Sequence, residues 1–352
     1  MTAPSLEPGS TFESNGYCYR IQRSVEVGDG REAQQRAMEE VRLATYLHHP
    51  NIANVYGCAA FEGQPYVVLE HQRGCFLLTL MDAAMQVNDM LSPAFAAYVA
   101  AQVAEALEYA HRCLDDKGRP LRIVHRAVGP LRIRLGAGGR VKLTNFGAAW
   151  SELMGRLRTP PGLLRGDVAY LAPEILRNVR EPEPGQADPL TPRGLDGRAD
   201  IFSLGLVLLE MLVAHYPLDP PEELWSDIPR RFPEGIRAEQ LPFLRVETLA
   251  DRVLHFGPEQ VRRACETVPE PLRRIVSRAL SQEPDERYPT AGELGAELRQ
   301  YLGTLGRAYG AAQLDDEVGR VLKGAADYRT LDAHGSVERG VLPLPSDMKT
   351  VD

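Results

Sequence analysis

The side chains that could bind phosphate or carry a proton gather in one segment of the chain, Val124–Gly147. His125 has an imidazole that titrates near neutral pH, so it could carry a proton. Arg126 and Arg132 have guanidinium groups that could grip a phosphate without a metal. Asn145 offers only a neutral amide oxygen, which holds a hard cation such as Mg²⁺ poorly. The segment contains no Asp or Glu, so it lacks a carboxylate that could bind a metal or accept a proton.

Short strands on either side of a Gly138-Gly139 hairpin must position this segment, because residues 141–144 alternate as a strand does. Before the segment, Ser92 followed by Pro93 predicts the start of a long helix, since Ser is a preferred N-cap and Pro suits the first helical position. After the segment, residues 199–214 are apolar nearly all round, which predicts a buried central helix.

Strands dominate the first part of the chain and helices dominate the rest. Predicted strands cover 16–27, 54–58 and 65–70, and predicted helices cover 31–48, 246–255, 259–267 and 272–280, with one more starting at Thr290 and another over 313–325. Residues 1–15 are predicted to be flexible, and residues 327–352 are predicted to form a tail. This layout predicts an α+β fold with a small sheet-rich part and a larger helical part.

The composition is that of an ordinary globular protein, with 352 residues and a net charge of −8. The acidic balance argues against nucleic acid or an anionic membrane as the main partner. The five cysteines are scattered and never form a C-x-x-C pair, which indicates reduced thiols. We find no signal-peptide pattern, and the most apolar stretch, Ile201–Ala214, is too short to span a bilayer. We therefore expect a cytoplasmic protein without membrane insertion.

The segment Val124–Gly147 resembles the catalytic loop and metal-binding segment of Hanks-type (eukaryotic-type) Ser/Thr protein kinases. The stretches 39–52 and 92–118 are similar to those of bacterial members from predatory soil bacteria, the myxobacteria. A kinase has His-Arg-Asp-x-Lys-Pro-x-x-Asn in the loop and Asp-Phe-Gly after a hairpin. The four positions that carry the chemistry are occupied here by Ala127, Gly129, Arg132 and Asn145.

The resemblance covers about residues 16–305 and implies a bilobal fold. A reduced β-rich N-lobe would span about 16–70, a helical C-lobe about 74–305, and a further helix and tail 306–352. The residues with implied structural roles are His125, Arg126, Phe146, Gly147, Glu174, Asp200 and Arg287. In particular, Asp200 is implied to hold the backbone of the catalytic loop, and Arg287 to pair with Glu174.

Each changed position removes a group that phosphoryl transfer needs. Ala127 can neither orient a substrate hydroxyl nor accept its proton, a loss that typically costs about 10²–10⁴ in rate. Asn145 replaces an anionic metal ligand, and Arg132 places a cation where another metal ligand belongs. Gly129 removes the lysine that would contact the transferred phosphate. These losses compound, because the groups act as a unit.

The roof over the nucleotide is predicted to be reduced, because only 39 residues precede Glu40, which resembles the αC glutamate. No Gly-x-Gly-x-x-Gly motif precedes a strand. Two alignments are open. Either Tyr17–Arg20 is the third strand and Arg20 replaces its lysine, which we prefer, or 16–25 is the first strand and the third is absent. The candidates for contact with a nucleotide are Arg20, Glu40, Leu69 at the gatekeeper position, Glu70 at the hinge, and Arg132.

The resemblance implies a degenerate member of the family, a pseudokinase that binds another protein and binds ATP and Mg²⁺ weakly or not at all. That partner would be an active kinase or another signalling component, and it would dock on the helix at 246–255 or on the chain after Gly310. Two alternatives are open: a diverged kinase with residual or altered transferase activity, and a module that senses nucleotide without metal through Arg132 and the hinge. Arg126 could also pair with a phosphorylated Ser151 or Thr159.

Overall fold

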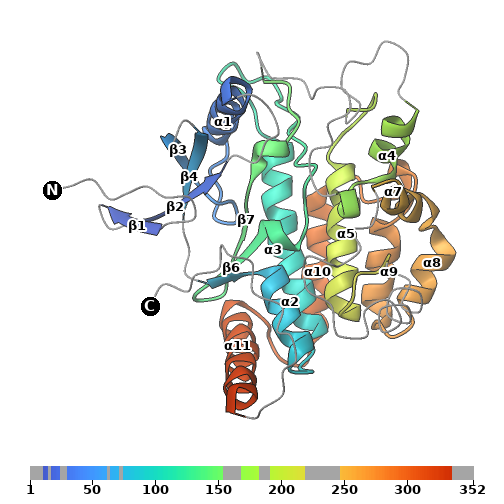
Figure 1. The fold of residues 1–352 in the computed structure, drawn as a ribbon. Coiled ribbons are helices and arrows are strands. Elements are labelled where there is room, and N and C mark those ends of the chain that lie inside the picture. Colours follow the sequence, from blue (N-terminus) through green and yellow to red (C-terminus); the bar gives the residue numbers. More distant parts are fainter. Residues whose placement is uncertain are drawn as a thin grey trace.

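The computed structural model describes residues 11–14, 17–23, 30–61, 64–70, 74–153, 168–181, 191–218 and 246–334. These residues form a small part, made of a β-sheet and one helix, beside a larger part built mostly of helices (Figure 1). The α+β, two-lobed architecture predicted from the sequence is confirmed.

A four-stranded antiparallel sheet forms the N-lobe, with the strand order β1-β2-β4-β3. The strands are β1 (Thr11–Ser14), β2 (Tyr17–Arg23), β3 (Val55–Phe61) and β4 (Gln64–Glu70). Helix α1 (Gly30–Ala44) packs against β3 and β4. Strand β1 corrects the prediction that residues 1–15 are flexible, because Thr11–Ser14 pair with Tyr17–Arg20 and backbone hydrogen bonds hold them in the sheet.

Two helices form the centre of the C-lobe, α3 (Pro93–His111) and α5 (Arg198–Val213), and they pack against each other. The predicted cap of α3 is present, since the Ser92 hydroxyl accepts a hydrogen bond from the Phe95 N–H at 3.1 Å. Helix α5 is buried from Ala199 to Met211, as its apolar sequence predicts.

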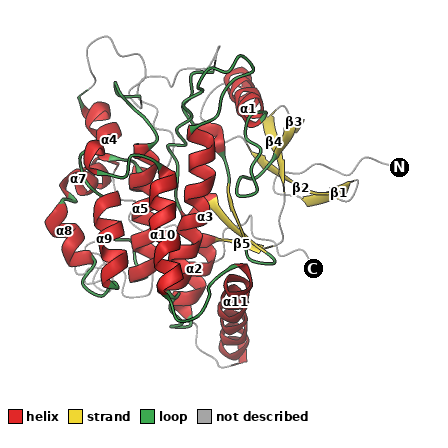
Figure 2. Ribbon diagram, turned by 180° about the vertical axis from the view of Figure 1, so that it is seen from behind, coloured by secondary structure: helices red, strands yellow, loops and turns green. Residues whose placement is uncertain are grey.

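The remaining helices surround this central pair, and α10 packs along α3 (Figure 2). The short strand β5 (Gly74–Phe76) leads into α2 (Leu77–Gln86), a helix that the sequence did not predict. The other C-lobe helices are α4 (Pro173–Arg180), α7 (Val246–His255), α8 (Pro258–Ala264), α9 (Glu270–Ala279) and α10 (Ala291–Thr304). Helices α7 to α10 lie close to the predicted ranges.

The last helix, α11 (Ala311–His334), is longer than predicted. The prediction of a tail from Asp327 is wrong for residues 327–334, which continue the helix. These residues include neither Gly nor Pro, and the next glycine is Gly335, so the sequence offers no helix-ending residue before that point. Among the described helices, none is both long enough and apolar enough to cross a membrane.

The chemically interesting segment lies where the lobes meet. Strands β6 (Ile133–Gly136) and β7 (Arg140–Leu143) form its hairpin, in which Gly138 and Gly139 have φ of +73° and +70°. These left-handed values favour glycine. Strand β7 also reaches the N-lobe side, because residues 51–53 pair with Leu143 through backbone hydrogen bonds of 2.8 and 2.9 Å. The hairpin is therefore a structural link between the two lobes.

Candidate functional site

Asp200 in helix α5 holds the backbone of the catalytic-loop segment. Its carboxylate accepts hydrogen bonds from the His125 N–H at 2.8 Å and from the Arg126 N–H at 2.9 Å, and the residue is fully buried. A third contact, of 2.9 Å, joins it to Nε2 of His111 at the end of α3. These contacts fix the backbone immediately before Ala127 to the two central helices, which is the role that the resemblance implied for Asp200.

The charge of Asp200 is stabilised by its partners. Burial by itself would raise the pKa of Asp200, because the ionised form loses solvation. The hydrogen bond with His111, the electrostatic interaction with the two histidine rings and the backbone N–H of His125 together outweigh burial and lower the pKa. The carboxylate is therefore ionised at neutral pH.

Sequence reasoning missed His111 as a partner of Asp200. The available signal was a histidine in the last turn of a predicted helix, which does not identify a partner 89 residues away. Gly197 makes room for this contact, because a Cβ there would come within 2.3 Å of Nδ1 of His111.

His125 is a packed core residue. Its ring meets the ring of Phe146 edge to face, with centroids 4.6 Å apart. Nε2 lies 3.1 Å from the carbonyl oxygen of Thr144, and Nδ1 accepts a hydrogen bond from the Ala127 N–H at 3.2 Å. A neutral ring with its proton on Nε2 satisfies both contacts. Burial lowers the pKa of His125 to about 4, so the ring is neutral at pH 7.

Small residues occupy two positions at which the resemblance implies a catalytic base and a lysine. Ala127 is 3% exposed and offers only a methyl group. At Gly129, an added Cβ would lie 3.3 Å from the ring of Tyr170. That ring is fixed, because the Tyr170 hydroxyl donates a hydrogen bond to the buried Glu210 carboxylate at 2.7 Å. Any side chain at position 129 would press against the Tyr170 ring.

Asn145 and Gly147 form a tight turn next to helix α1. Asn145 has φ of 63°, and its side-chain oxygen accepts a hydrogen bond from the Gly147 N–H at 3.3 Å. The carboxylate of Glu40 lies against the same turn, since its Oε2 would be 2.7 Å from a Cβ at Gly147. The side chain of Arg20, the predicted partner of Glu40, lies outside the described residues, so that pair stays a prediction.

The residues at the metal positions do not match the oxygen-rich set that Mg²⁺ prefers. The amide oxygen of Asn145 already faces the Gly147 N–H. Arg132 contributes a positive charge, which acts on His125 and helps to lower its pKa. In the part of the chain that the structure describes, no group of three or more His, Cys, Asp or Glu is placed to hold a metal ion.

Arg126 is built into the loop. The residue is 1% exposed, and it donates from Nε to the carbonyl oxygen of Ala148 at 2.9 Å and from Nη1 to the Thr191 hydroxyl at 3.3 Å. One of its predicted phosphorylated partners, Ser151, is buried. The other, Thr159, lies outside the described residues. The described contacts of Arg126 are therefore structural.

The sheet topology bears on the two alignments of the N-lobe. Strand β2 precedes α1 and lies directly beside β4, the strand that leads to the hinge, and Arg20 is opposite Leu69 in the register. The preferred alignment, in which this strand is the third, stays a prediction. Only β1, a strand of four residues, pairs with β2 on its other side among the described strands.

Glu70 at the hinge joins the lobes through its side chain. Its Oε2 accepts hydrogen bonds from Nζ of Lys142 and from Nδ2 of Asn54, both at 2.9 Å. The Lys142 ammonium also donates to the carbonyl oxygen of Ile52 at 3.1 Å. Lys142 lies in β7 and is 7% exposed. This partly buried ion pair was not predicted from the sequence, where Lys142 is one residue of an alternating strand.

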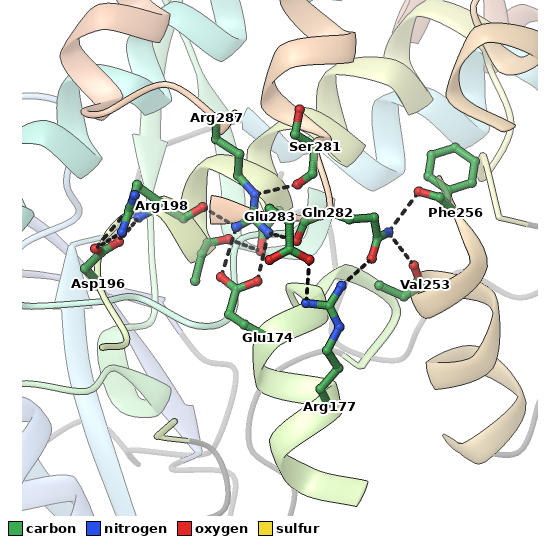
Figure 3. Close-up of polar contacts among 12 residues, drawn as sticks. Glu174, Arg177, Asp196, Arg198, Val253, Phe256, Ser281, Gln282, Glu283 and Arg287 are labelled. Atoms are coloured by element: carbon green, nitrogen blue, oxygen red, sulfur yellow. Dashed lines mark hydrogen bonds and ion pairs between the residues drawn. The ribbon is translucent and has the colours of Figure 1, made fainter. Parts of the chain in front are cut away.

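At the base of the C-lobe, Arg287 and Glu174 form the ion pair that the resemblance implied (Figure 3). Two parallel hydrogen bonds, of 2.9 and 2.8 Å, join the guanidinium to the carboxylate. The guanidinium also donates to the carbonyl oxygens of Ser281 at 2.7 Å and Arg198 at 2.9 Å. The Arg287 side chain is fully buried, so nearly all of its hydrogen-bonding capacity is directed into the protein.

Comparison with known proteins agrees with this geometry. Residues 14–296 match the family described as the protein kinase domain. Tyrosine-protein kinase MasK of Myxococcus xanthus is 28% identical over 286 residues, which cover 81% of this chain and 38% of that protein. Serine/threonine-protein kinase PrkC of Bacillus subtilis is 26% identical over 309 residues, which cover 87% of this chain and 40% of that protein. The match therefore spans about two fifths of the length of these relatives.

Proposed function

The chain belongs to the protein kinase family, and we propose that it is a pseudokinase, a protein-binding scaffold or regulator that does not transfer phosphate. One observation carries the proposal: Asp200 holds the loop backbone at His125 and Arg126 with hydrogen bonds of 2.8 and 2.9 Å, and the next residue is Ala127. The loop backbone is fixed in position, but position 127 offers no carboxylate that could orient a substrate hydroxyl.

The surroundings of the loop support the proposal. Phosphoryl transfer needs metal ions to neutralise the charge that develops on the phosphate. Here an amide stands at position 145 and a guanidinium at position 132, and the amide oxygen is engaged by Gly147 N–H. We therefore propose that Mg²⁺·ATP is bound weakly or not at all.

The proposed partner is a protein of bacterial Ser/Thr kinase signalling, because the relatives named above are bacterial protein kinases. A net charge of −8 disfavours nucleic acid in that role. We place the protein in the cytoplasm on the basis of its scattered, odd-numbered cysteines, of which the four described ones are free. Helix α7 (Val246–His255) remains a proposed docking element.

Thermal unfolding with ATP, with and without Mg²⁺, tests nucleotide binding, and incorporation of radiolabelled phosphate tests transfer. We expect no change in melting temperature and no incorporated label. A catalytically active bacterial relative, which should show a raised melting temperature and incorporated label, is the positive control. A stabilisation that requires Mg²⁺ would contradict the assignment of positions 132 and 145. Label incorporated by protein from a kinase-free host would overturn the proposal as a whole.

A variant with the kinase residues restored in the loop distinguishes two causes of inactivity, the absent catalytic side chains and the reduced N-lobe over the nucleotide. It carries four substitutions, Ala127→Asp, Gly129→Lys, Arg132→Asn and Asn145→Asp. We expect it to bind Mg²⁺·ATP more tightly than the natural chain yet to transfer phosphate far more slowly than the active relative, because β1 and β2 leave little chain for a glycine-rich loop. Full activity in this variant would show that the four side chains alone account for the loss.

A further inference from the structure

The C-terminal helix α11 (Ala311–His334) lies beyond the family match, which ends at residue 296. It nevertheless packs against α2 and α3 of the C-lobe (Figure 1). Helix α2 is the first helix after the hinge, and the β6–β7 hairpin is part of the segment Val124–Gly147. Helix α11 contacts α2 and the turn of the hairpin, so it joins two segments that lie far apart in the sequence.

Glu317 is the centre of the attachment. The residue is 9% exposed. Its carboxylate accepts three hydrogen bonds, from the Ser92 N–H at 2.6 Å, the Ser92 hydroxyl at 2.9 Å and the Tyr309 hydroxyl at 2.8 Å. Ser92 is the N-cap of α3, so the Glu317 charge lies at the N-terminus of a long buried helix, where the helix dipole favours an anion. Glu317 thereby extends the cap of α3 from a helix 225 positions later in the chain.

The first turn of α11 lies against the hairpin. The carboxylate of Asp315 accepts a hydrogen bond from the Gly138 N–H at 3.0 Å. At Gly139, an added Cβ would lie only 1.9 Å from the carbonyl oxygen of Ala311. The two glycines therefore serve two purposes, since they form the left-handed turn and let α11 approach its backbone.

Further along, α11 lies against the end of α2. An added Cβ at Gly324 would be 4.0 Å from the Cβ of Val87, and Arg320 forms an ion pair with Asp89. Over residues 311–326, where burial is described, the buried apolar side chains of α11 are Leu314, Val321 and Ala325. Val318 and Leu322 also pack against the core while partly exposed, and Glu317 lies on the same face of α11. Removing its carboxylate would take an acceptor from three donors at the centre of the attachment, which is costly at a buried position.

We propose that α11 is a releasable clasp, a conformational device that holds α2 and the β6–β7 hairpin as one cooperative unit beside the hinge. Its docking depends on Glu317, and its release loosens α2 and the hairpin while the central helices stay folded. Local unfolding of peripheral units is common in proteins, and elements that move in regulation come from the parts of lowest local stability. The inference holds whether or not the protein transfers phosphate.

Hydrogen exchange of the full-length chain, with Cys58→Ser to remove an exposed thiol, tests the clasp. We expect Glu317→Ala to speed exchange about tenfold or more in 311–325, 77–86 and 133–143, with α5 and α9 unchanged. Glu317→Gln keeps an acceptor and should give a smaller change. Asp316→Asn, an exposed neighbour on the same helix, should leave exchange as in the parent.

An engineered disulfide tests whether the undocking of α11 causes the faster hydrogen exchange in α2 and the hairpin. The Cβ separation of 4.0 Å between positions 87 and 324 lies within the usual range of about 3.5–4.5 Å for a disulfide. We expect Val87→Cys with Gly324→Cys, oxidised, to restore slow exchange in 77–86 and 133–143 of the Glu317→Ala chain. Acceleration confined to α11, acceleration of α5 and α9 to the same extent, or failure of the disulfide to restore protection would each overturn the proposal.

Discussion

The bottom of the C-lobe and the cleft loop differ in what their polar side chains contact. At the base, the Arg287 guanidinium is fully buried and is hydrogen-bonded to Glu174 and to backbone carbonyls. In the loop, Ala127 and Gly129 offer no polar side chain, and the Asn145 amide oxygen is turned to its own backbone. Both regions are anchored to helix α5, so they belong to one folded body.

This difference shows which residues the fold itself requires. Removing one partner from a buried ion pair leaves an uncompensated charge, at a cost of about 3–5 kcal/mol, which is a large part of the stability of a typical domain. Replacing a side chain that only contacts a metal or a substrate carries no such cost. Residues of the cleft can therefore change with little loss of stability, whereas the ion pair at the bottom of the C-lobe cannot.

The largest effect is expected at the base, from Arg287→Met. Glu174 would lose both of its hydrogen bonds to the guanidinium, and the carbonyl oxygens of Ser281 and Arg198 would lose a donor. We expect the free energy of unfolding in urea to fall by about 3–5 kcal/mol. Arg274→Ala provides the control, because its ion pair with Glu270 is exposed and should contribute about 0.5 kcal/mol or less. A loss below about 1 kcal/mol at Arg287 would contradict the comparison.

A smaller effect is expected between the lobes, from Lys142→Met. Glu70 would keep its contacts with Asn54 but lose the ammonium at 2.9 Å. The Glu70 side chain is 18% exposed, so water can compensate in part. We therefore expect a loss of about 2–3 kcal/mol in the same assay, against little change for the exposed Lys117→Met. Equal stability of the two variants would show that the Glu70 pair does not hold the hinge.

The pH dependence of stability tests His125 directly. Its pKa is about 4 in the folded protein and about 6.5 in the unfolded chain, so between these values the unfolded chain binds more protons. Stability therefore rises with pH across this interval, and lowering the pH from 7 to 5 should cost on the order of 2 kcal/mol from this group. Urea unfolding of His125→Gln at both pH values should show a smaller difference than the parent. An unchanged difference would mean that other groups cause it.

The smallest effect is expected in the cleft loop, from Gly129→Ala. Its φ of −164° is accessible to any residue, so the backbone is not strained. The added methyl would lie 3.3 Å from the Tyr170 ring, and we expect a cost of about 1 kcal/mol from crowding. Combining it with Tyr170→Leu should remove most of that cost in a double-mutant cycle. If the free-energy changes of the two substitutions were simply additive, the cost of the methyl at position 129 would not come from the Tyr170 ring.

Much of the fold was predictable because it depends on local patterns. The cap at Ser92, the buried stripe of α5 and the glycine hairpin each follow from a few neighbouring residues, and the structure has all three. Helix α2 was missed because its sequence is apolar on most sides and follows a strand without a clear break. The strand at Thr11–Ser14 was missed because its partner, not its composition, makes it a strand.

The candidate site divides in the same way. The sequence by itself determined which residues stand at the positions where the resemblance implies catalytic groups, since a residue such as Ala127 is read directly from the chain and its chemical consequence is local. Only the tertiary structure decided where the remaining charges go: His111 to Asp200, Lys142 to Glu70, and Glu317 to the cap of α3. Each of these pairs spans 70 or more positions of the chain, and burial, which selects such partners, is a property of the packed molecule rather than of any segment.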